Sequence, residues 1–353
     1  MLYALILAGG KGIRLYPLSR EKTPKQFLNI FNNKSFLKNT VERVIPIIDK
    51  ENIYIVTNET YREKISKEVP EVLVNNVFIE PENKETATCI GLSAVKLLKK
   101  DNDAVLIILP SDHHIEGQKE FKDTIMQCVD IAEKKRGIVT IGIKPVRPET
   151  GYGYIKMGDR IPGAIPSYKV NRFLEKPNIE VAKDLILNED YLWNSGIFVT
   201  RADVYLREME KYLPQMYKNM MSIYSDIDTE KEWETVVSNY KLIEGISIDF
   251  GILQKTRKAY VVKCDFLWDD IGSFTALSRY IGENRNDSGT YYLEDSEDCF
   301  IYSKDKLIIG FGIKDLIIIN GGDVILIMDK NKDQELKHLV NKISTDESMK
   351  EFL

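Results

Sequence analysis

Short apolar runs alternate, in the first half of the chain, with segments in which apolar residues recur every three or four positions. The short runs are rich in β-branched residues and predict strands, whereas the longer segments predict amphipathic helices. Ser35 and Thr86 are candidate N-caps for two of these helices, and residues 121–132 show the same periodicity. Buried strands that alternate with helices predict a mostly parallel sheet covered on both faces. The strand candidates are residues 2–7, 53–57, 104–109 and 137–143.

The pattern changes in the second half of the chain. Residues 151–199 mix short strands with glycine turns, and residues 201–240 are helical in pattern. Short β-type runs then recur over residues 290–329, and a helix is expected over residues 334–343. We therefore predict an α/β fold with a Rossmann-like, mostly parallel mixed sheet flanked by helices. A small C-terminal β domain, left-handed β-helix-like in character, is expected to follow it.

The chain length and the turn signals both indicate two domains. A chain of 353 residues corresponds to roughly two domains of ordinary size. The stretch from Asn284 to Gly289 is polar and rich in turn residues. We therefore expect a larger domain over residues 1–285 and a small β-rich domain over residues 286–353.

The charge balance excludes some classes of partner. Lys and Arg number 49 against 54 Asp and Glu, a net charge of −5, whereas a protein whose main partner is nucleic acid usually has a basic excess. Anionic substrates would need local cations or a metal, because the overall field opposes them. We expect no nucleic-acid partner. A zinc site is also not expected, since the chain has three histidines and no CxxC pair.

The cysteines and the apolar stretches indicate the compartment. The four cysteines lie among apolar neighbours, which is typical of buried thiols in a reducing compartment. The apolar run at residues 2–8 follows no basic segment and precedes glycines, so it predicts a first strand rather than a signal peptide. The apolar stretch at residues 316–328 is interrupted by polar residues and is too short to span a bilayer. We expect a soluble, cytoplasmic protein with no membrane partner.

A glycine-rich loop follows the first predicted strand. Gly9, Gly10 and Gly12 let backbone N–H groups approach a phosphate chain closely. The loop lacks the Ser or Thr of a Walker A loop and the third glycine of the dinucleotide fingerprint. Arg14 and Lys25 place two cations near the loop, which suits a triphosphate. The structural alternatives are a simple tight turn and a solvated surface lysine at position 25.

Two carboxylates are candidates for a Mg²⁺ site. Asp112 follows the strand at residues 104–109, at the sheet edge where ligands bind, and a carboxylate beside phosphates is suited to hold Mg²⁺. Two carboxylates in the stretch WDDIG, Asp269 and Asp270, could complete the site, and Asp270 is the one expected to bind the metal. The alternatives are that Asp112 caps the next turn and that Asp270 is the N-cap of a helix beginning near Ser273. His113 is a weaker candidate for a base or a ligand, and a structural role is expected for it.

Four polar clusters suit a sugar phosphate. Glu175 can accept hydrogen bonds from paired sugar hydroxyls, Lys176 can hold a phosphate, and Asn194 offers both a donor and an acceptor. Asp249 adds a further carboxylate. Each residue also has a local alternative, as a surface ion pair, a turn residue or an N-cap. The clusters are residues 148–155, 173–177, 193–198 and 247–252.

These motifs, in this order, resemble the sugar nucleotidyltransferase family, and within it the branch that uses GTP and mannose 1-phosphate. The resemblance covers nearly the whole chain, and the C-terminal GFGIKDLIIIN and DVILI resemble the short β domain of that branch. Long bifunctional relatives add an isomerase domain after this point, so isomerase activity is not expected. The motifs are AGGKGIRLYPLS, PKQFL, EP, PSDH, ETGYGYI, FLEKP, WNSGIF, SIDFGI and WDDIG.

The resemblance implies a reaction and a role for each matching residue. The reaction is transfer of GMP from GTP to mannose 1-phosphate, with Mg²⁺ as the cofactor. Arg14, Lys25 and Lys176 would be the catalytic cations. The nucleotide would be bound by Ala8, Gly9, Gly10, Gly12, Glu80, Thr86, Ala87 and Asp112. The sugar phosphate would be bound by Gly153, Glu175, Asn194 and Asp249, and Mg²⁺ by Asp112 and Asp270.

One stretch departs from the family's pattern. The family usually has Arg-Asn-Thr-Ala-Pro where residues 84–88 of this chain read Lys-Glu-Thr-Ala-Thr. Guanine presents N–H donors, which Glu80 or backbone carbonyls could accept. Base and sugar selectivity therefore stay open, and the alternatives are another nucleoside triphosphate or sugar 1-phosphate, or a non-catalytic regulatory subunit. Open strand edges in the C-terminal domain also suggest a homodimer.

Overall fold

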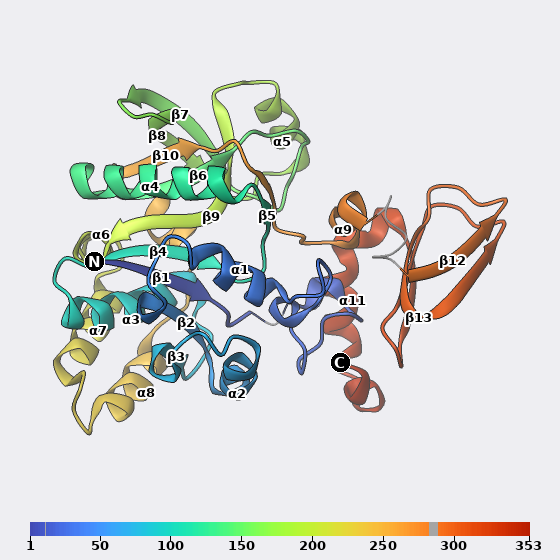
Figure 1. Cartoon of the computed structure of the whole chain (residues 1–353), viewed down its shortest axis with the longest axis horizontal. Helices are drawn as coiled ribbons and strands as arrows, with labels where there is room; N and C mark the ends of the chain where they lie inside the picture. Colours follow the sequence, from blue (N-terminus) through green and yellow to red (C-terminus); the bar gives the residue numbers. More distant parts are fainter. Residues whose placement is uncertain (11, 282–288) are drawn as a thin grey trace. The chain divides into compact units, whose positions relative to one another are not determined.

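The structure of the chain is a computed structural model and describes residues 1–10, 12–281 and 289–353 (Figure 1). Contacts between residues divide the chain into two compact units. Unit 1 comprises Met1–Gly9, Thr40–Ser111 and Ile115–Trp268, and unit 2 comprises Gly10–Asn39, Asp112–His114 and Asp269–Leu353. The predicted domain boundary between residues 285 and 286 lies outside the described residues.

Unit 1 is built on a nine-stranded mixed sheet in the order β3-β2-β1-β4-β9-β6-β10-β8-β7. Strands β9 and β8 run antiparallel to their neighbours, and the other seven run in one direction. The predicted α/β fold with a mostly parallel mixed sheet is confirmed. The strands are β1 (Leu2–Leu7), β2 (Ile53–Asn58), β3 (Val77–Glu80), β4 (Val105–Pro110), β6 (Ile138–Ile143), β7 (Tyr154–Ile161), β8 (Ser167–Leu174), β9 (Tyr191–Arg201) and β10 (Ala259–Lys263). A separate pair joins β5 (His114–Glu116) to β11 (Leu267–Asp269).

Helices cover both faces of the nine-stranded sheet (Figure 1). Tyr3 and Leu5 of β1 share a hydrophobic core with residues of α3, α6, α7 and α8. Ala4 and Ile6 point to the other face and are also fully buried, and α4 packs on β6, β9 and β10. The helices of unit 1 are α2 (Glu59–Glu68), α3 (Glu85–Lys100), α4 (Gln118–Lys135), α5 (Ile179–Ile186), α6 (Ala202–Tyr212), α7 (Pro214–Asp226) and α8 (Glu232–Leu242). Across the described ranges, no helix is both long and apolar enough to cross a membrane.

The carboxyl ends of β1 and β4 lie next to each other in the sheet. The two strands are parallel neighbours, with Leu7 opposite Pro110, and the Ser111 N–H donates to the Leu7 carbonyl at 3.1 Å. The chain passes into unit 2 shortly after each strand, at Gly10 and at Asp112. The glycine loop and Asp112 thus follow the carboxyl ends of adjacent strands, as the sequence predicts.

Unit 2 joins the C-terminal β domain to a segment from the N-terminal part of the chain. Its hydrophobic core contains Leu15 of segment Gly10–Asn39 together with Phe274, Ile317 and Leu336. The sheet has the order β12-β13-β14-β15, and its first two pairings are parallel, as in a β-helix. The elements are α1 (Phe36–Val44, continuing into unit 1), α9 (Phe274–Ile281), β12 (Gly289–Glu294), β13 (Phe300–Phe311), β14 (Leu316–Asn320), β15 (Ile325–Asp329) and α11 (Leu336–Ile343).

The structure confirms most of the predicted helices and changes two local details. Ser35 caps α1, since its hydroxyl accepts from the Lys38 N–H at 3.0 Å. The prediction that Thr86 caps α3 is wrong, because the helix begins at Glu85 and the Thr86 hydroxyl accepts from the Ile248 N–H at 2.9 Å. Helix α5 lies where strands and turns were expected, and it begins after a capping side chain at Asn178.

Asp333 caps α9 from a distant part of the sequence. Its buried carboxylate accepts hydrogen bonds from the backbone N–H groups of Phe274 (3.2 Å) and Thr275 (2.7 Å). An N-cap carboxylate also interacts favourably with the helix dipole. This contact therefore fixes the start of the helix that follows the Asp270 turn.

We expect Asp333→Ala to lower the free energy of unfolding by about 2 kcal/mol, because two backbone donors lose a charged acceptor. Asp333→Asn should lower the free energy of unfolding by less, since its amide oxygen can still accept a hydrogen bond from these backbone donors. Urea unfolding followed by circular dichroism measures both variants. Glu335→Ala is the matched control, because the exposed Glu335 side chain forms a surface ion pair with Lys332. This substitution should change the free energy of unfolding by less than about 0.5 kcal/mol. Equal losses in Asp333→Ala and the control would contradict the assigned cap.

Candidate functional site

The glycine loop of unit 2 has a conformation that requires glycine at one position. Gly12 has φ of 60°, and a Cβ there would lie 2.5 Å from the Lys25 Cβ. The loop is held from both sides, because Gln26 donates to the Gly10 carbonyl at 3.2 Å and the Ser19 hydroxyl donates to the Gly12 carbonyl. Arg14 lies on the 3₁₀ turn that follows, and it is exposed with no ion-pair partner among the described residues. An exposed guanidinium beside open backbone is suited to bind phosphate.

Lys25 is buried and joins two of the predicted acidic sites. Its side chain is 6% exposed, and its Nζ donates to Asp112 Oδ2 at 2.9 Å. The same Nζ donates to the backbone carbonyl of Asp270. The phenyl ring of Phe36 lies 5.3 Å from the Nζ. The alternative of a solvated surface lysine is therefore wrong, and three predicted residues of unit 2 lie together.

Asp112 keeps its negative charge in this setting. Burial acts to raise its pKa, but the charges of Lys25 and His113 and the hydrogen bond from Lys25 outweigh burial, so the pKa lies below its usual value. About a third of the side chain, 34%, remains exposed. An ionised, partly accessible carboxylate is suited to a divalent cation. The neighbouring His114 stacks on Phe31 with ring centres 4.2 Å apart, which is a packing role.

Asp270 lies in a strained turn that its neighbour Asp269 holds in place. Ile271 has φ of 45°, which is rare for a β-branched residue. Asp269 is 1% exposed and accepts from the Ile271 N–H at 2.8 Å and from Arg279 at 3.1 Å. The Asp270 carboxylate accepts from the Gly272 N–H at 2.9 Å. Asp270 does not cap α9, because Asp333 and Ser273 accept the first backbone donors of that helix.

The acidic residues of unit 2 fit a metal that is shared with a substrate. Within the described ranges, no group of three or more His, Cys, Asp or Glu side chains could hold a metal alone. Mg²⁺ needs no such cage, since it is usually held by one or two carboxylates together with substrate phosphates and waters. The ionised Asp112 carboxylate and the Asp270 side chain supply such a donor set, and Lys25 links the two residues through Asp112 Oδ2 and the Asp270 backbone carbonyl.

Glu80 is a buried carboxylate at the end of β3 in unit 1. Tyr240 donates to its Oε1 at 3.0 Å, and the Cys89 thiol also hydrogen-bonds to it. Burial raises the pKa of Glu80 to about 7, although these two hydrogen bonds act in the opposite direction. A Cβ on Gly9 would lie 3.8 Å from Glu80 Oε2, so this carboxylate is next to the end of β1.

Thr86 and Ala87 are engaged by the protein itself. The Ala87 N–H donates to the Ile246 carbonyl at 3.2 Å, and Tyr205 donates to the Ala87 carbonyl at 2.9 Å. Ala87 and Ala8 are both fully buried. Ala8 and Ala87, which were both predicted to bind the nucleotide, are therefore buried parts of the site that present no side chain to a ligand. Glu85, at the start of α3, has φ of 66°, a conformation that asparagine, the family's usual residue, adopts more readily.

Asn194 lies at a β-bulge in β9. The pairing with β6 shifts register between Thr140 and Gly142, and Gly196 has φ of 73°. Such bulges often lie next to functional sites and redirect a side chain. Thr140 donates to Asn194 Oδ1 at 2.7 Å, and Asn194 Nδ2 donates to Asp249 Oδ1 at 3.0 Å. The amide is thereby fixed with its nitrogen toward the carboxylate.

Glu175, Lys176 and Gly153 lie together, with Glu175 and Lys176 near Asp249. A Cβ on Gly153 would lie 2.7 Å from Glu175 Oε2, so the Glu175 carboxylate lies directly against this glycine. Glu175 is 4% exposed and pairs with Lys176, which is 50% exposed. Burial, and then the charge of Glu175, raise the pKa of Asp249 to about 7, while Lys176 lowers it. Unit 1 thus brings together all the residues predicted for the sugar phosphate.

Four residues support the site without being ligands in the structure, and of these only Asp269 was a candidate ligand in the sequence prediction. Thr140 fixes the Asn194 amide, Tyr240 and Cys89 donate to Glu80, and Asp269 holds the Asp270 turn. Tyr240 and Glu80 are 160 residues apart in sequence, and Thr140 and Asn194 are 54 apart. A local pattern cannot reveal such partners. Asp269 is the exception, since two adjacent acids in one short motif suggest that one of them is structural.

We expect Lys25 and Asp112 to be energetically coupled. In a double-mutant cycle of Lys25→Met and Asp112→Asn, the coupling should be about 1–2 kcal/mol, because a partly buried charge loses its partner in each single variant. Urea unfolding of the four proteins at pH 7 measures it. The exposed pair Lys67–Glu63 is the control, with Lys67→Met and Glu63→Gln, and its coupling should stay below about 0.5 kcal/mol. Coupling no larger than in the control pair would refute the buried bridge.

We expect Asp249→Asn to gain stability relative to the unaltered chain as the pH rises from 5 to 8. Between its ordinary pKa and about 7, Asp249 keeps a proton in the fold that the unfolded chain has released. Its contribution to stability therefore falls with rising pH over that window, and the asparagine removes this loss. The gain should be on the order of 2 kcal/mol in urea unfolding at pH 5, 6, 7 and 8. The exposed Asp159→Asn should show a constant difference, and a constant difference for Asp249→Asn would contradict the raised pKa.

Family comparisons cover both parts of the chain. Residues 3–285 match the nucleotidyl transferase family. Residues 293–343 match the MannoseP isomerase/GMP-like beta-helix domain, which confirms the predicted β-helix-like character of the C-terminal part.

Two relatives that are similar over nearly the whole chain are both named mannose-1-phosphate guanylyltransferase. A mannose-1-phosphate guanylyltransferase from Klebsiella pneumoniae is 34% identical over 347 residues, which are 96% of this chain and 73% of that protein. The mannose-1-phosphate guanylyltransferase ManC of Salmonella typhimurium is 32% identical, over 98% of this chain and 74% of its own length.

Solved structures share the fold. A crystal structure described as a mannose-1-phosphate geranyltransferase from Thermus thermophilus aligns with a TM-score of 0.86 at 28% identity, over 97% of this chain and 99% of that one. A mannose-6-phosphate isomerase from Helicobacter pylori aligns with a TM-score of 0.62 at 28% identity, over 76% of this chain and 99% of that one. The resemblance inferred from the sequence motifs is confirmed, and the chain belongs to the nucleotidyl transferase family.

Proposed function

We propose that the chain transfers GMP from GTP to α-D-mannose 1-phosphate and releases GDP-mannose and pyrophosphate. The observation that carries the proposal is the similarity, over nearly the whole chain, to enzymes named mannose-1-phosphate guanylyltransferase. The retained Arg14, Lys25 and Asp112 argue against a non-catalytic regulatory subunit, which would have no need of them. We assign phosphate and metal chemistry to residues of unit 2, and base and sugar recognition to residues of unit 1.

The triphosphate is assigned to the glycine loop and its cations. Gly10 and Gly12 expose backbone without side chains, and Arg14 is an exposed guanidinium on the next turn. Lys25 contributes its charge next to the loop, because Gly12 packs directly against it. A bidentate guanidinium and a fixed ammonium together balance much of the charge of a triphosphate.

Mg²⁺ is assigned to Asp112 and Asp270. The lowered pKa of Asp112 keeps it ionised, and the Asp269 contacts fix the Asp270 turn. When bound, Mg²⁺ would neutralise charge on the phosphates of the nucleotide and on the leaving pyrophosphate. Lys25 then holds the two acidic segments in place through Asp112 Oδ2 and the Asp270 carbonyl.

The guanine base is assigned to the neighbourhood of Glu80. Guanine presents N1–H and N2–H₂ donors, which require an acceptor. Glu80 carries a carboxylate whose pKa of about 7 lets it gain charge as it accepts those donors. The strained Glu85 lies at the start of α3, in the stretch that departs from the family's usual residues.

Mannose 1-phosphate is assigned to the cluster around Asn194. Glu175 and Asp249 are acceptors for sugar hydroxyls, and Asn194 lies between donor and acceptor neighbours. Lys176 is half exposed and has φ of 44°, a strained conformation that directs it beside Glu175. Its ammonium is suited to the phosphate of the sugar.

In the proposed reaction, an oxygen of the sugar phosphate attacks the α-phosphorus of GTP in line. The new P–O bond forms as the bond between the α-phosphorus and the bridging oxygen breaks, and pyrophosphate leaves. The nucleophile is already ionised, since the second pKa of a phosphate monoester is about 6, so no general base is needed. Two like charges 4 Å apart repel by about 4 kcal/mol at an effective dielectric of 20. Arg14, Lys25 and Lys176 oppose that repulsion, so catalysis consists of positioning and charge stabilisation.

Compartment and assembly remain predictions. None of the four cysteines is in a disulfide, and three of them are buried, in keeping with a cytoplasmic location. For the predicted homodimer, the C-terminal sheet offers β12 and β15 as its edge strands.

The test is pyrophosphate release from each of four nucleoside triphosphates with mannose 1-phosphate or glucose 1-phosphate, in the presence of Mg²⁺. We expect release with GTP and mannose 1-phosphate. Asp112→Asn should reduce turnover by roughly 100-fold or more, and the exposed Asp159→Asn should leave it unchanged. Release with a different pair would move the specificity to that pair, and no release from a folded protein would refute the proposal.

A further inference from the structure

Tyr280, on α9 of unit 2, contacts both of the chain segments that carry the carboxylates assigned to Mg²⁺. Its hydroxyl donates to Asp269 Oδ2 at 3.2 Å, and Asp269 directly precedes Asp270. Its ring lies against the imidazole of His114, with ring centres 5.0 Å apart and the two planes inclined by 63°. His114 is two residues after Asp112, in the same short segment of unit 2. One side chain therefore links the surroundings of both carboxylates.

The hydroxyl of Tyr280 reaches the Asp270 turn through Asp269. The Asp269 carboxylate is 1% exposed, and its Oδ2 also accepts from Arg279 at 3.1 Å. Its Oδ1 accepts from the N–H of Ile271, the residue whose φ of 45° is unfavourable for a β-branched side chain. Such a backbone conformation persists only when its surroundings hold it in place. Tyr280 and Arg279 thus fix the carboxylate that maintains the turn.

The ring of Tyr280 belongs to an aromatic cluster that joins all three segments of unit 2. His114 stacks on Phe31, and the Phe31 ring also meets Tyr280 edge-on, with centres 6.3 Å apart. Phe31 meets Phe36 in the same edge-on way, with centres 5.7 Å apart. Edge-to-face aromatic pairs are favourable beyond the area that they bury. The cluster therefore fixes His114, and with it the backbone that follows Asp112, relative to α9.

The helix that carries Tyr280 is itself held by the C-terminal part of the chain. Asp333 accepts hydrogen bonds from the backbone N–H groups of Phe274 and Thr275 at the start of α9. The apolar side of α9 shares a hydrophobic core with Leu336 of α11. A shift of α9 would move Tyr280 with it. The C-terminal part of the chain is thereby connected to both carboxylate segments.

We propose that Tyr280 is a positioning residue for Asp112 and Asp270, and that the C-terminal part of the chain contributes to metal binding through it. The proposal rests on the proposed function, which assigns Mg²⁺ to these two carboxylates. Tyr280 acts through Asp269 and His114 and is not itself a ligand. Removal of groups that orient metal ligands weakens metal binding by about 10–100-fold in other proteins. Loss of Tyr280 should therefore weaken the contribution of the metal to nucleotide binding.

The test compares the affinity for GTP, measured by calorimetry, without Mg²⁺ and with saturating Mg²⁺. We expect Mg²⁺ to tighten GTP binding by the unaltered chain. Tyr280→Leu should lose about tenfold of this gain, because the hydroxyl and ring contacts are both removed. Tyr280→Phe should lose about threefold, since its ring is kept and Arg279 still donates to Asp269. The affinity without Mg²⁺ should be unchanged in both variants.

Two further measurements extend the test to turnover and to the C-terminal part of the chain. The Mg²⁺ concentration for half-maximal pyrophosphate release should rise by the same factors in the Tyr280 variants. A general loss of folded protein would lower the rate and leave this concentration unchanged. Asp333→Ala should lose about threefold of the Mg²⁺-dependent gain in GTP affinity, because the start of α9 is no longer capped.

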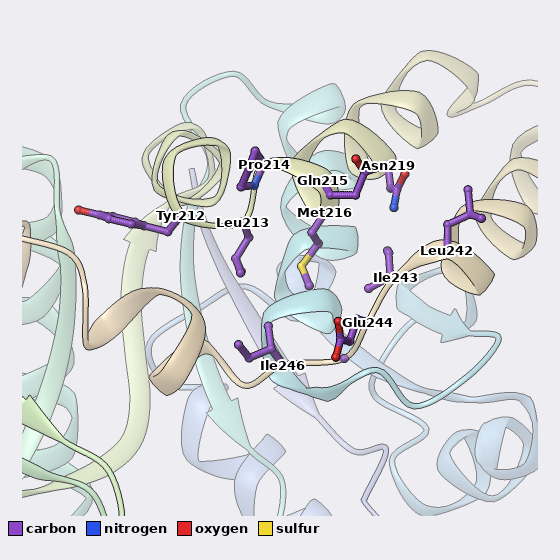
Figure 2. A pocket seen from close by; sticks show the side chains of 11 residues that line it. Tyr212, Leu213, Pro214, Gln215, Met216, Asn219, Leu242, Ile243, Glu244 and Ile246 are labelled. Atoms are coloured by element: carbon purple, nitrogen blue, oxygen red, sulfur yellow. The ribbon is translucent and has the colours of Figure 1, made fainter.

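Two controls separate positioning from destabilisation. Met216→Ala removes a buried side chain from the wall of a cavity of about 490 Å³ in unit 1 (Figure 2). It should lower stability and keep the full Mg²⁺-dependent gain. Tyr292→Phe matches Tyr280→Phe, because the exposed Tyr292 hydroxyl donates to Glu294 at 3.3 Å on β12. It should also keep the full gain. Circular dichroism establishes that each variant is folded.

Three results would overturn the role of Tyr280: a full Mg²⁺-dependent gain in Tyr280→Leu, a GTP affinity that falls equally with and without Mg²⁺ in that variant, or an equal loss of the gain in Met216→Ala. A full gain in Asp333→Ala would overturn the contribution of the C-terminal part and leave Tyr280 standing. An unaltered chain whose GTP affinity does not respond to Mg²⁺ would contradict the proposed function itself, and the role of Tyr280 would fall with it.

Discussion

A single buried ammonium holds together the three chain segments that make up unit 2. Lys25 belongs to Gly10–Asn39, its partner Asp112 to Asp112–His114, and its second acceptor, the Asp270 carbonyl, to Asp269–Leu353. Burying a lone ammonium would be costly, and each acceptor lowers that cost only if its segment is in place. The same bridge keeps Asp112 ionised and packs Lys25 against Gly12. The positions of Gly12, Asp112 and the Asp270 turn therefore depend on one charge, in addition to the apolar core that the segments share.

The pKa values of the site carboxylates are shifted in opposite directions in the two units. In unit 2 a neighbouring cation keeps the pKa of Asp112 low, whereas in unit 1 burial raises the pKa values of Glu80 and Asp249 to about 7. A permanent negative charge is suited to a metal, and a carboxyl group that titrates near neutrality is suited to neutral hydrogen-bond donors such as base edges and sugar hydroxyls. This division follows the proposed division of labour between phosphate chemistry and recognition.

The sequence predicted the fold class and the grouping of site residues better than it predicted their supports. Strands such as β1 and helices such as α1 follow from periodicity and capping, which are local properties. Asn194 and Glu175 were found because each lies in a compact polar motif. Thr140, which orients Asn194, lies 54 residues away in the chain and is invisible to any local pattern. Residue type alone predicts Thr86 as a helix cap. In the structure its hydroxyl instead accepts a hydrogen bond from the Ile248 N–H, a contact that depends on tertiary packing.

The interleaved composition of unit 2 has a consequence for how the protein is made. Leu15 and Phe36 emerge early in synthesis, but the apolar side chains that complete their core, such as Phe274 and Leu336, follow more than two hundred residues later. Until then, the early segment exposes apolar surface, and closing its core requires contacts of long sequence separation, which form slowly. A ribosome that stalls after residue 268 would thus release a chain with unit 1 fully synthesised and the Lys25 ammonium without its Asp270 acceptor. In such a chain, the apolar side chains of segment Gly10–Asn39 would stay exposed to the chaperones and proteases that act on nascent proteins.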